Sequence, residues 1–234
     1  MAWQSDGVDV RVNFARPVPV FPIDGLVVLP QQVVPLHIFE KRYRQMVDLS
    51  LDGAGQIAMA LPAPSPEPGA AALRPCVCIG QIIHHEKLAD GRYNILLQGV
   101  CRGTISRALQ PEGDRLFLLA ELEPGETAPE DESAIAELRD WIERELESGG
   151  LSRFGAAEDL LEYVRNDDIP AETIAEIVSF TMLQEVDSRY RMLAEPSPER
   201  RAELLRSLLG DLARLVRLAE RQRPDDWPRG VSWN

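Results

Sequence analysis

Four prolines near the start of the chain restrict what its first part can form. Pro19, Pro22, Pro30 and Pro35 each lack a backbone amide donor and hold φ near one value. A continuous helix is therefore excluded across this segment, and any central strand would be interrupted. The segment is predicted to consist of short extended pieces.

A short amphipathic helix is predicted to follow directly. Phe39, Tyr43, Met46 and Val47 recur at helical spacing, which places them on one apolar face. Glu40 lies in the first turn of this helix, where a carboxylate interacts favourably with the positive end of the helix dipole.

Up to about residue 124 the rest of the chain has the pattern of β-strands. Strand-length apolar runs occur at 56–61, 76–83 and 115–122, and the segment 87–97 contains a turn signal. Asp90-Gly91 lies between two apolar runs and predicts a tight hairpin, because glycine reaches positive φ without steric cost. About six strands with one short inserted helix predict a closed or nearly closed small barrel.

The pattern becomes helical after residue 124. Thr127 and Glu130 have the spacing of a capping box. The helical stripe that follows consists of Ile135, Leu138, Ile142 and Leu146. Residues 158–164 are predicted to form a further short helix, and Pro170 is expected to be the first residue of another.

A long final helix is predicted from Ser197, a capping residue that is followed by proline. Its apolar stripe consists of Leu205, Leu208, Leu212, Leu215 and Ala219. Such a stripe suits a coiled coil between two chains or packing within one chain. It lasts about two heptads, which is short for a coiled coil, so packing within a monomer is favoured.

These patterns predict an α+β protein with four parts. They are a disordered or extended N-terminus (1–16), a β-barrel subdomain (17–124), an α-helical subdomain (125–222) and an irregular tail (223–234). The tail contains Trp227 and Trp233, which are costly to leave in water, so they are expected to dock on the body or on a partner.

Composition limits the class of function. The formal net charge of −13 disfavours a nucleic-acid partner, because phosphate binding depends on clustered cations. No apolar run approaches the roughly 20 residues that span a bilayer. The first residues are acidic where a signal peptide is basic, so a cytoplasmic protein without a membrane partner is expected.

The cysteines Cys76, Cys78 and Cys101 are predicted to be reduced thiols, since they are odd in number and no export signal precedes them. A zinc site would add His84 and His85, but Cys-x-Cys is not the usual ligand spacing. Small buried core thiols are favoured, and neither a metal nor another cofactor is expected.

The segment from Val18 to Ile23, followed by Val27–Pro30 and Pro35–Met46, resembles the opening of the Lon N-terminal (substrate-recognition) domain family. Asp90–Ile95, followed by Gly99-Val100, resembles a second part of the same family. The resemblance covers about residues 17–219. It implies a PUA-like β-barrel followed by a helical bundle, as in stand-alone bacterial members and in the related domain of cereblon.

Three positions depart from the family pattern. Gln31 stands where a glycine usually follows the proline, and Lys41 stands where a proline often follows Ile-Phe-Glu. In the segment Arg102–Ile105, Gly103 follows the arginine, where the family often has an aromatic residue. These departures weaken the transfer of individual residue roles but leave the expected fold unchanged.

No catalytic machinery is predicted. Full-length Lon proteases carry an ATPase module and a Ser-Lys peptidase, but these 234 residues contain no Gly-x-x-x-x-Gly-Lys-Ser/Thr motif. A Ser-Lys pair would need Lys41 or Lys87, and both lie in the region that resembles the recognition domain. We therefore expect a protein that is not an enzyme.

Eight residues are candidates for a protein-binding surface or for a structural motif. They are His37, Phe39, Glu40, Arg42, Tyr43, Asp90, Arg92 and Tyr93. The charged residues either form the rim of a peptide-binding surface or join the short helix to the barrel, and the second alternative is favoured. Aromatic burial dominates small cores, so the three aromatic residues are expected in the core.

The favoured function is a non-catalytic module that binds exposed hydrophobic or unfolded protein segments, and that acts as an adaptor in protein quality control. The segments would bind at a concave, partly apolar junction between barrel and helices, through an added strand or an apolar groove. One alternative is an RNA-binding PUA-like protein. Another is a small hydrolase that acts through Cys101 or through one of His37, His84 and His85.

Overall fold

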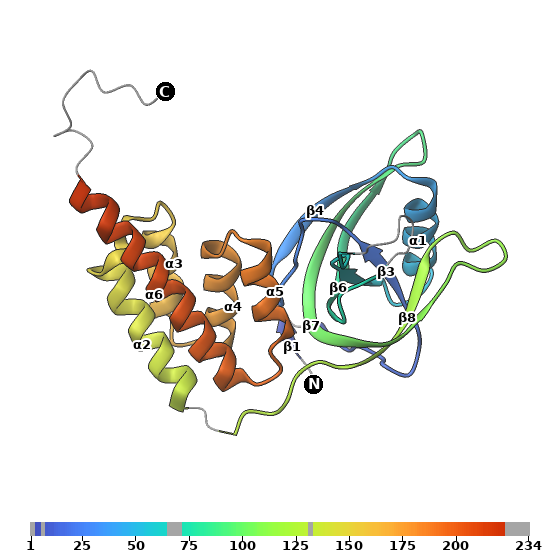
Figure 1. Cartoon of the computed structure of the whole chain (residues 1–234). Helices are drawn as coiled ribbons and strands as arrows, with labels where there is room; N and C mark the ends of the chain where they lie inside the picture. Colours follow the sequence, from blue (N-terminus) through green and yellow to red (C-terminus); the bar gives the residue numbers. More distant parts are fainter. Residues whose placement is uncertain (1–2, 6–7, 65–71, 131–132, 223–234) are drawn as a thin grey trace, which may run out of the picture.

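The computed structural model describes residues 3–5, 8–64, 72–130 and 133–222. Figure 1 shows two parts side by side, a β-barrel and a group of helices, joined by one extended segment. The prediction of an α+β fold with a barrel first and helices second is confirmed. Trp227 and Trp233 lie outside the described residues.

The strands precede all helices but one. They are β1 (Trp3–Ser5), β2 (Val8–Val10), β3 (Val18–Pro22), β4 (Val33–Ile38), β5 (Gln56–Ala60), β6 (Cys76–Lys87), β7 (Tyr93–Leu109) and β8 (Leu118–Pro124). The helices are α1 (Lys41–Leu51), α2 (Ser133–Glu147), a 3₁₀ turn (Gly150–Arg153), α3 (Ala157–Arg165), α4 (Ala171–Met182), α5 (Val186–Ala194) and α6 (Pro198–Gln222). Strands β1 and β2 pair with each other within the segment expected to be disordered or extended.

The barrel closes through its longest strand. Its six-stranded sheet has the order β4-β7-β6-β5-β3-β8, and β8 also pairs with β7. The second half of β7 pairs with β8, whereas its first half pairs with β4. Five strands therefore form a closed ring, and β4 is attached to β7 as an additional edge strand.

The proline-rich segment forms short extended pieces, as predicted. Strands β3 and β4 have five and six residues, and they contain Pro19, Pro22 and Pro35. The predicted hairpin is also present, with Gly91 at a φ of 80° between β6 and β7.

Helix α1 packs its predicted apolar face into the barrel. Tyr43, Met46 and Val47 are buried, but Phe39 is 62% exposed. The prediction that Phe39 belongs to the core is therefore wrong. Phe39 lies before the first residue of α1, so its side chain does not follow the buried face of the helix.

The proposed capping box is wrong as well, because α2 begins only at Ser133. The Thr127 amide and hydroxyl both donate to the Pro196 carbonyl, at 3.1 and 3.3 Å. The Glu130 amide donates to a Glu199 carboxylate oxygen at 2.5 Å. This segment therefore packs against the start of α6 instead of starting a helix.

Helix α6 starts as predicted, since the Ser197 hydroxyl accepts the Arg200 amide at 3.2 Å. Its predicted stripe is only partly right. The residues of α6 that are buried against the other helices are Arg201, Ala202, Leu205, Leu209 and Ala213. Leu215 is 60% exposed and Ala219 is exposed too, so the buried face ends near residue 213.

Candidate functional site

The predicted site residues gather at one end of the barrel, where β4, α1 and the β6–β7 hairpin meet. The Asp90 carboxylate accepts the Arg92 amide at 3.0 Å and the Arg92 Nε at 2.6 Å. Arg92 Nη1 lies 3.2 Å from His37 Nε2, and His37 Nδ1 lies 2.7 Å from Asn94 Oδ1. Since arginine only donates, His37 Nε2 accepts and its Nδ1 donates to Asn94.

Glu40, Arg42 and Tyr43 form a second group at the start of α1. Arg42 Nη2 lies 2.8 Å from the Glu40 carboxylate, and the Arg42 guanidinium lies 4.5 Å from the centre of the Tyr43 ring. Glu40 precedes α1 but makes no capping hydrogen bond. Tyr43 is buried, as predicted for an aromatic core residue.

Tyr93 is also buried, and its hydroxyl donates to the Asp48 carboxylate. Lys87 Nζ lies 3.1 Å from the same carboxylate and 5.0 Å from the centre of the Tyr93 ring. Burial acts to raise the pKa of Asp48, but hydrogen bonds from Tyr93 and Lys87 lower it overall. Sequence reasoning missed Asp48, because nothing distinguishes it from other carboxylates on an exposed helix face.

The residues proposed for a hydrolase do not come together. Cys101 lies opposite Ile79, whereas His84 lies opposite Leu96, several residues further along β6. His84 and His85 are both exposed, because a register shift between Ile82 and His84 interrupts the alternation of inward and outward side chains.

Burial also disfavours the nucleophilic thiolate form of two of the three cysteines. Burial raises the pKa of Cys101 to about 12 and the pKa of Cys78 well above its usual value. Among the described residues, no group of three or more His, Cys, Asp or Glu side chains is arranged to hold a metal ion.

Strand β4 presents an open edge beside this cluster. No described strand pairs with its second side. The Gly99 amide donates to the Gln32 carbonyl at 2.8 Å, directly before β4. Hydrogen-bonded and non-bonded pairs alternate along an antiparallel ladder, so every second residue from Val34 bonds to β7. The residues whose backbone groups face the open side are Val33, Pro35 and His37.

A surface pocket of about 350 Å³ lies next to this edge, on the outer face of β4, β7 and β6. Its lining residues are Pro35, Leu36, His37, His84, Glu86, Asn94, Ile95 and Leu96. The strand register places them in two rows across the sheet. One row is His37, Asn94 and Glu86, and the other is Pro35, Leu96 and His84.

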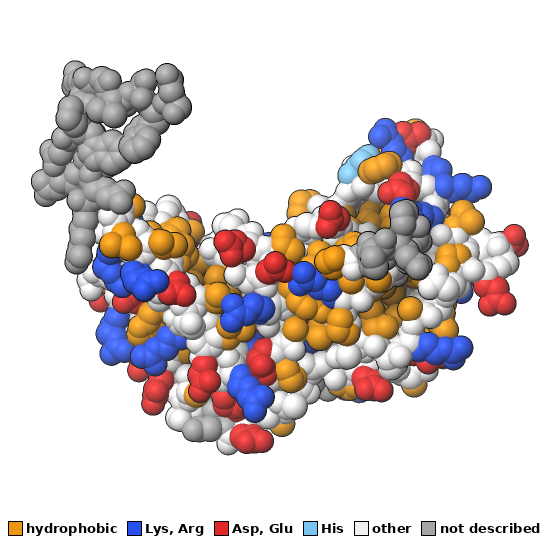
Figure 2. All heavy atoms as spheres, viewed as in Figure 1, with side chains coloured by type: hydrophobic (Ala, Val, Ile, Leu, Met, Phe, Trp, Pro, Cys, Tyr) orange, Lys and Arg blue, Asp and Glu red, His pale blue; other side chains and the backbone are white. Residues whose placement is uncertain are grey.

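The open edge borders a hollow in the molecular surface. In Figure 1, β4 lies on the side of the barrel that faces α4 and α5. Figure 2 shows that the surface is hollowed between the helices and the barrel, and that hydrophobic side chains gather on the barrel wall. Three large apolar side chains of β4, β6 and the β4–α1 turn are exposed, namely Val33 (46%), Ile83 (49%) and Phe39 (62%).

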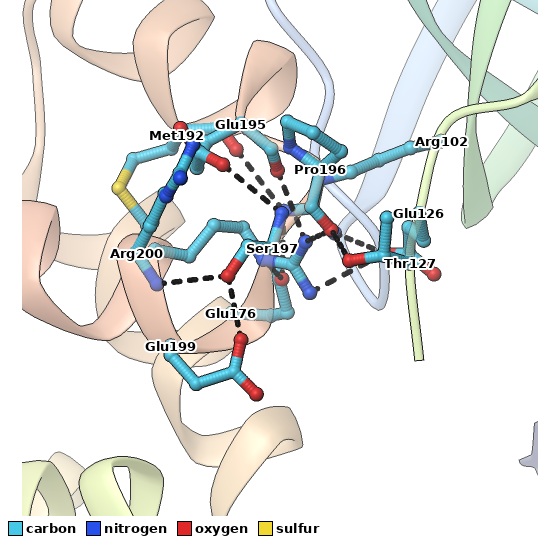
Figure 3. Close-up of polar contacts among 11 residues, drawn as sticks. Arg102, Glu126, Thr127, Glu176, Met192, Glu195, Pro196, Ser197, Glu199 and Arg200 are labelled. Atoms are coloured by element: carbon cyan, nitrogen blue, oxygen red, sulfur yellow. Dashed lines mark hydrogen bonds and ion pairs between the residues drawn. The ribbon is translucent and has the colours of Figure 1, made fainter. Parts of the chain in front are cut away.

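A buried ion network lies at the junction between the helices and the barrel. Arg102 from β7 lies 2.6 Å from Glu126 and 2.7 Å from Glu176 of α4. It also donates to the Met192 carbonyl of α5 at 3.3 Å. The Arg102 side chain is 2% exposed. Figure 3 shows these groups converging at the junction.

Arg201 of α6 completes the network. It lies 3.6 Å from Glu126 and 3.8 Å from Glu176, and it donates to the Glu195 and Pro196 carbonyls at 3.0 and 3.1 Å. Burial would lower the pKa of Arg102, but the two carboxylates raise it overall. Sequence reasoning did not find this network, although it noted that the segment starting at Arg102 departs from the family pattern.

A second contact joins α5 to the barrel. The Arg74 guanidinium lies 4.6 Å from the centre of the Tyr190 ring and 2.8 Å from the Asp187 carboxylate. The Tyr190 hydroxyl accepts the Cys76 amide of β6 at 3.0 Å. These two polar contacts add to the hydrophobic core cluster that is shared by the barrel and the helices.

None of the described helices combines the length and the apolar composition needed to cross a membrane.

Comparison with known families matches residues 17–211 to the model of the ATP-dependent protease La (LON) substrate-binding domain. Lon protease 2 of Syntrophobacter fumaroxidans is 25% identical over 99% of this chain, which spans 29% of that relative. Lon protease of Escherichia coli K12 is 28% identical over 50% of this chain and 15% of its own length. The chain thus spans less than a third of these relatives.

Two solved structures have the same fold. The N-terminal domain of the Mycobacterium avium complex Lon protease superposes with a TM-score of 0.64 at 19% identity, and covers 84% of this chain and 99% of its own. The Lon N-terminal domain protein from Xanthomonas campestris superposes with a TM-score of 0.58 at 18% identity, and covers 82% of this chain and 98% of its own.

Proposed function

Because this chain belongs to the family of the LON substrate-binding domain, we propose that it binds extended, apolar segments of other proteins along the open edge of β4. The observation that carries this proposal is the unpaired edge itself. The family supports recognition of protein substrates, and an open strand edge beside exposed apolar side chains is suited to an unfolded segment.

Binding would add a strand to the sheet. The open side of β4 offers two amide donors, from Val33 and His37, and three carbonyl acceptors, because Pro35 has no N–H. Side chains of the added strand would alternate between the two faces of the sheet. Every second one would lie on the outer face, beside Val33 and Pro35. Backbone pairing depends little on sequence, so affinity is expected to be weak and selectivity broad.

Pro35 has a protective role in this scheme. An edge strand with a complete set of donors and acceptors would pair readily with other copies of itself. A proline in the middle of β4 removes one donor and so limits such pairing. The edge therefore favours transient binding of a client segment over permanent aggregation.

We further propose that the protein holds client segments without cutting them. The raised pKa values of Cys78 and Cys101, and the separation of Cys101 from His84, argue against thiol hydrolysis. An adaptor role in protein quality control would follow, in which the bound segment is passed to another component.

The test compares His37→Pro with His37→Ala in binding a fluorescent peptide of alternating apolar and polar residues. Both variants remove the imidazole and its contacts, but only proline removes the outward amide. We expect His37→Pro to bind about fivefold more weakly than His37→Ala, which corresponds to one lost hydrogen bond. Fluorescence anisotropy measures the affinities.

Thermal melts of the two variants serve as the control for folding. A matched surface variant is Leu116→Ser, since Leu116 is 40% exposed in the segment before β8 and should leave binding unchanged. Equal affinities of the two His37 variants would exclude the β4 edge. Failure of the unaltered protein to bind apolar peptides, combined with salt-sensitive binding of single-stranded RNA, would instead support the nucleic-acid alternative.

A further inference from the structure

We propose that the pocket on the outer face of β4, β7 and β6 receives a basic side chain, arginine or lysine, of the bound client segment. This inference rests on the proposed function and adds a preference to it. Among the extended apolar segments that the open edge accepts, those with a correctly placed cation are selected.

The pocket has apolar walls and one charged lining residue. Pro35 and Leu96 supply apolar side chains on this outer face, whereas Leu36 and Ile95 border the pocket from strand positions that face the core. Among the described lining residues, Glu86 alone carries a full charge. Arginine and lysine have an apolar stem and a charged end. The stem of such a side chain would cross Pro35 of β4 and reach Leu96, and its charged end would approach Glu86.

Glu86 differs from the other carboxylates at this end of the barrel. Glu40, Asp48 and Asp90 each form an ion pair with a basic side chain. The partners are Arg42, Lys87 and Arg92, at 2.8, 3.1 and 2.6 Å. No described arginine or lysine forms an ion pair with Glu86, whose only described side-chain partner is the Asn94 amide at 3.2 Å. Its carboxylate is exposed and keeps acceptor positions for an incoming cation.

The orientation of the carboxylate is set by a chain of hydrogen bonds. Arg92 donates to His37, His37 donates to the Asn94 carbonyl oxygen, and the Asn94 amide donates to Glu86. A carboxylate held in this way loses less side-chain freedom when it pairs with a cation. The net charge of −13 also attracts basic segments from a distance.

The experiment uses two peptides with the same alternating apolar sequence. One carries arginine at a single outward position, and the other carries citrulline, which has nearly the same shape but no charge. The position is scanned along the peptide, so that one register places it over the pocket. At low salt we expect the best arginine peptide to bind about threefold to fivefold more tightly than its citrulline counterpart. Salt near 1 M should reduce this preference, because it screens exposed charges.

The variant Glu86→Gln should abolish the preference, so that the arginine and citrulline peptides bind with equal affinity. The matched control is Glu123→Gln, an exposed carboxylate on β8 that does not line the pocket. It removes one negative charge, as Glu86→Gln does, and should keep the preference.

The outcomes separate the two proposals. Equal binding of both peptides by the unaltered protein would overturn the basic-side-chain preference and leave the proposed function standing. The same loss in Glu86→Gln and Glu123→Gln would show a general charge effect and exclude the pocket. Failure to bind either peptide would overturn the proposed function, and the inference with it.

Discussion

At the residue scale, Gln31 has the least favourable backbone conformation that the structure describes. Its φ of 69° makes it the one non-glycine residue with positive φ among the described residues. The Gln31 amide donates to the Gly99 carbonyl at 2.9 Å, which holds the turn that leads into β4. Glycine adopts this conformation without steric cost.

We therefore predict that Gln31→Gly stabilises the protein. A side chain in the left-handed region costs about 1–2 kcal/mol, and the greater freedom of glycine in the unfolded chain offsets about 0.4–1 kcal/mol of this. Chemical denaturation should show a free energy of unfolding about 0.5–1 kcal/mol higher. Gly91→Ala, at a φ of 80°, is the reciprocal control and should destabilise. Loss of stability in Gln31→Gly would mean that the glutamine side chain makes a compensating contact.

At the element scale, α6 shows how helical spacing leaves a choice between neighbouring faces. Leucines at positions 204, 205, 208, 209, 212 and 215 allow more than one apolar stripe. The other helices bury the face of Leu205, Leu209 and Ala213, whereas Leu208 and Leu212 lie at its border. The last turns of α6 extend past the buried contacts, so Leu215 and Leu218 remain exposed.

We predict that Leu209→Ala lowers the free energy of unfolding by about 2–5 kcal/mol, because it leaves a cavity in a fully buried site. Leu215→Ala makes the same chemical change on the same helix at an exposed position and should alter stability by less than about 0.5 kcal/mol. Denaturation followed by circular dichroism compares the two. Similar losses in both variants would mean that Leu215 is covered in solution, for example in a dimer.

At the scale of the whole molecule, the orientation of helices and barrel depends on charges that are buried between them. Arg102 binds two carboxylates that lie 24 and 74 residues further along the chain. Such a network adds specificity of arrangement more than it adds stability, because desolvation offsets much of the ionic attraction.

We predict that Arg102→Met lowers the free energy of unfolding by about 3 kcal/mol or more, since it leaves Glu126 and Glu176 buried with only the longer contacts to Arg201. Arg107 lies on β7, like Arg102, but forms an exposed ion pair with Glu121 of β8. Arg107→Met should therefore change the free energy of unfolding by less than about 0.5 kcal/mol. Denaturation midpoints measure both effects, and small-angle X-ray scattering detects any opening of the junction. Equal, small effects would show that the junction does not depend on Arg102.

Local features of the sequence were sufficient for the fold and for part of the site. The proline-rich pieces, the hairpin at Asp90-Gly91, helix α1 and the start of α6 at Ser197 all follow from φ preferences, capping and apolar periodicity. These properties act within a few residues of the chain, so they can be read directly. Of the candidate residues, Asp90 and Arg92 come together within the hairpin for the same reason. His37 meets Arg92 only through the pairing of β4 with β7, which joins segments more than 50 residues apart.

Contacts between distant segments were decided only by the tertiary structure. Thr127 and Glu130 have the spacing of a helix start, yet they bind the residues that begin α6. Phe39 fits the apolar face of α1 in the sequence but lies outside it in space. The charges of the junction network look like ordinary surface charges until the barrel and the helices pack together. By itself the sequence determined which elements form; their packing determined which side chains are buried, which charges meet and which strand edge stays open, because these depend on partners far away in the chain.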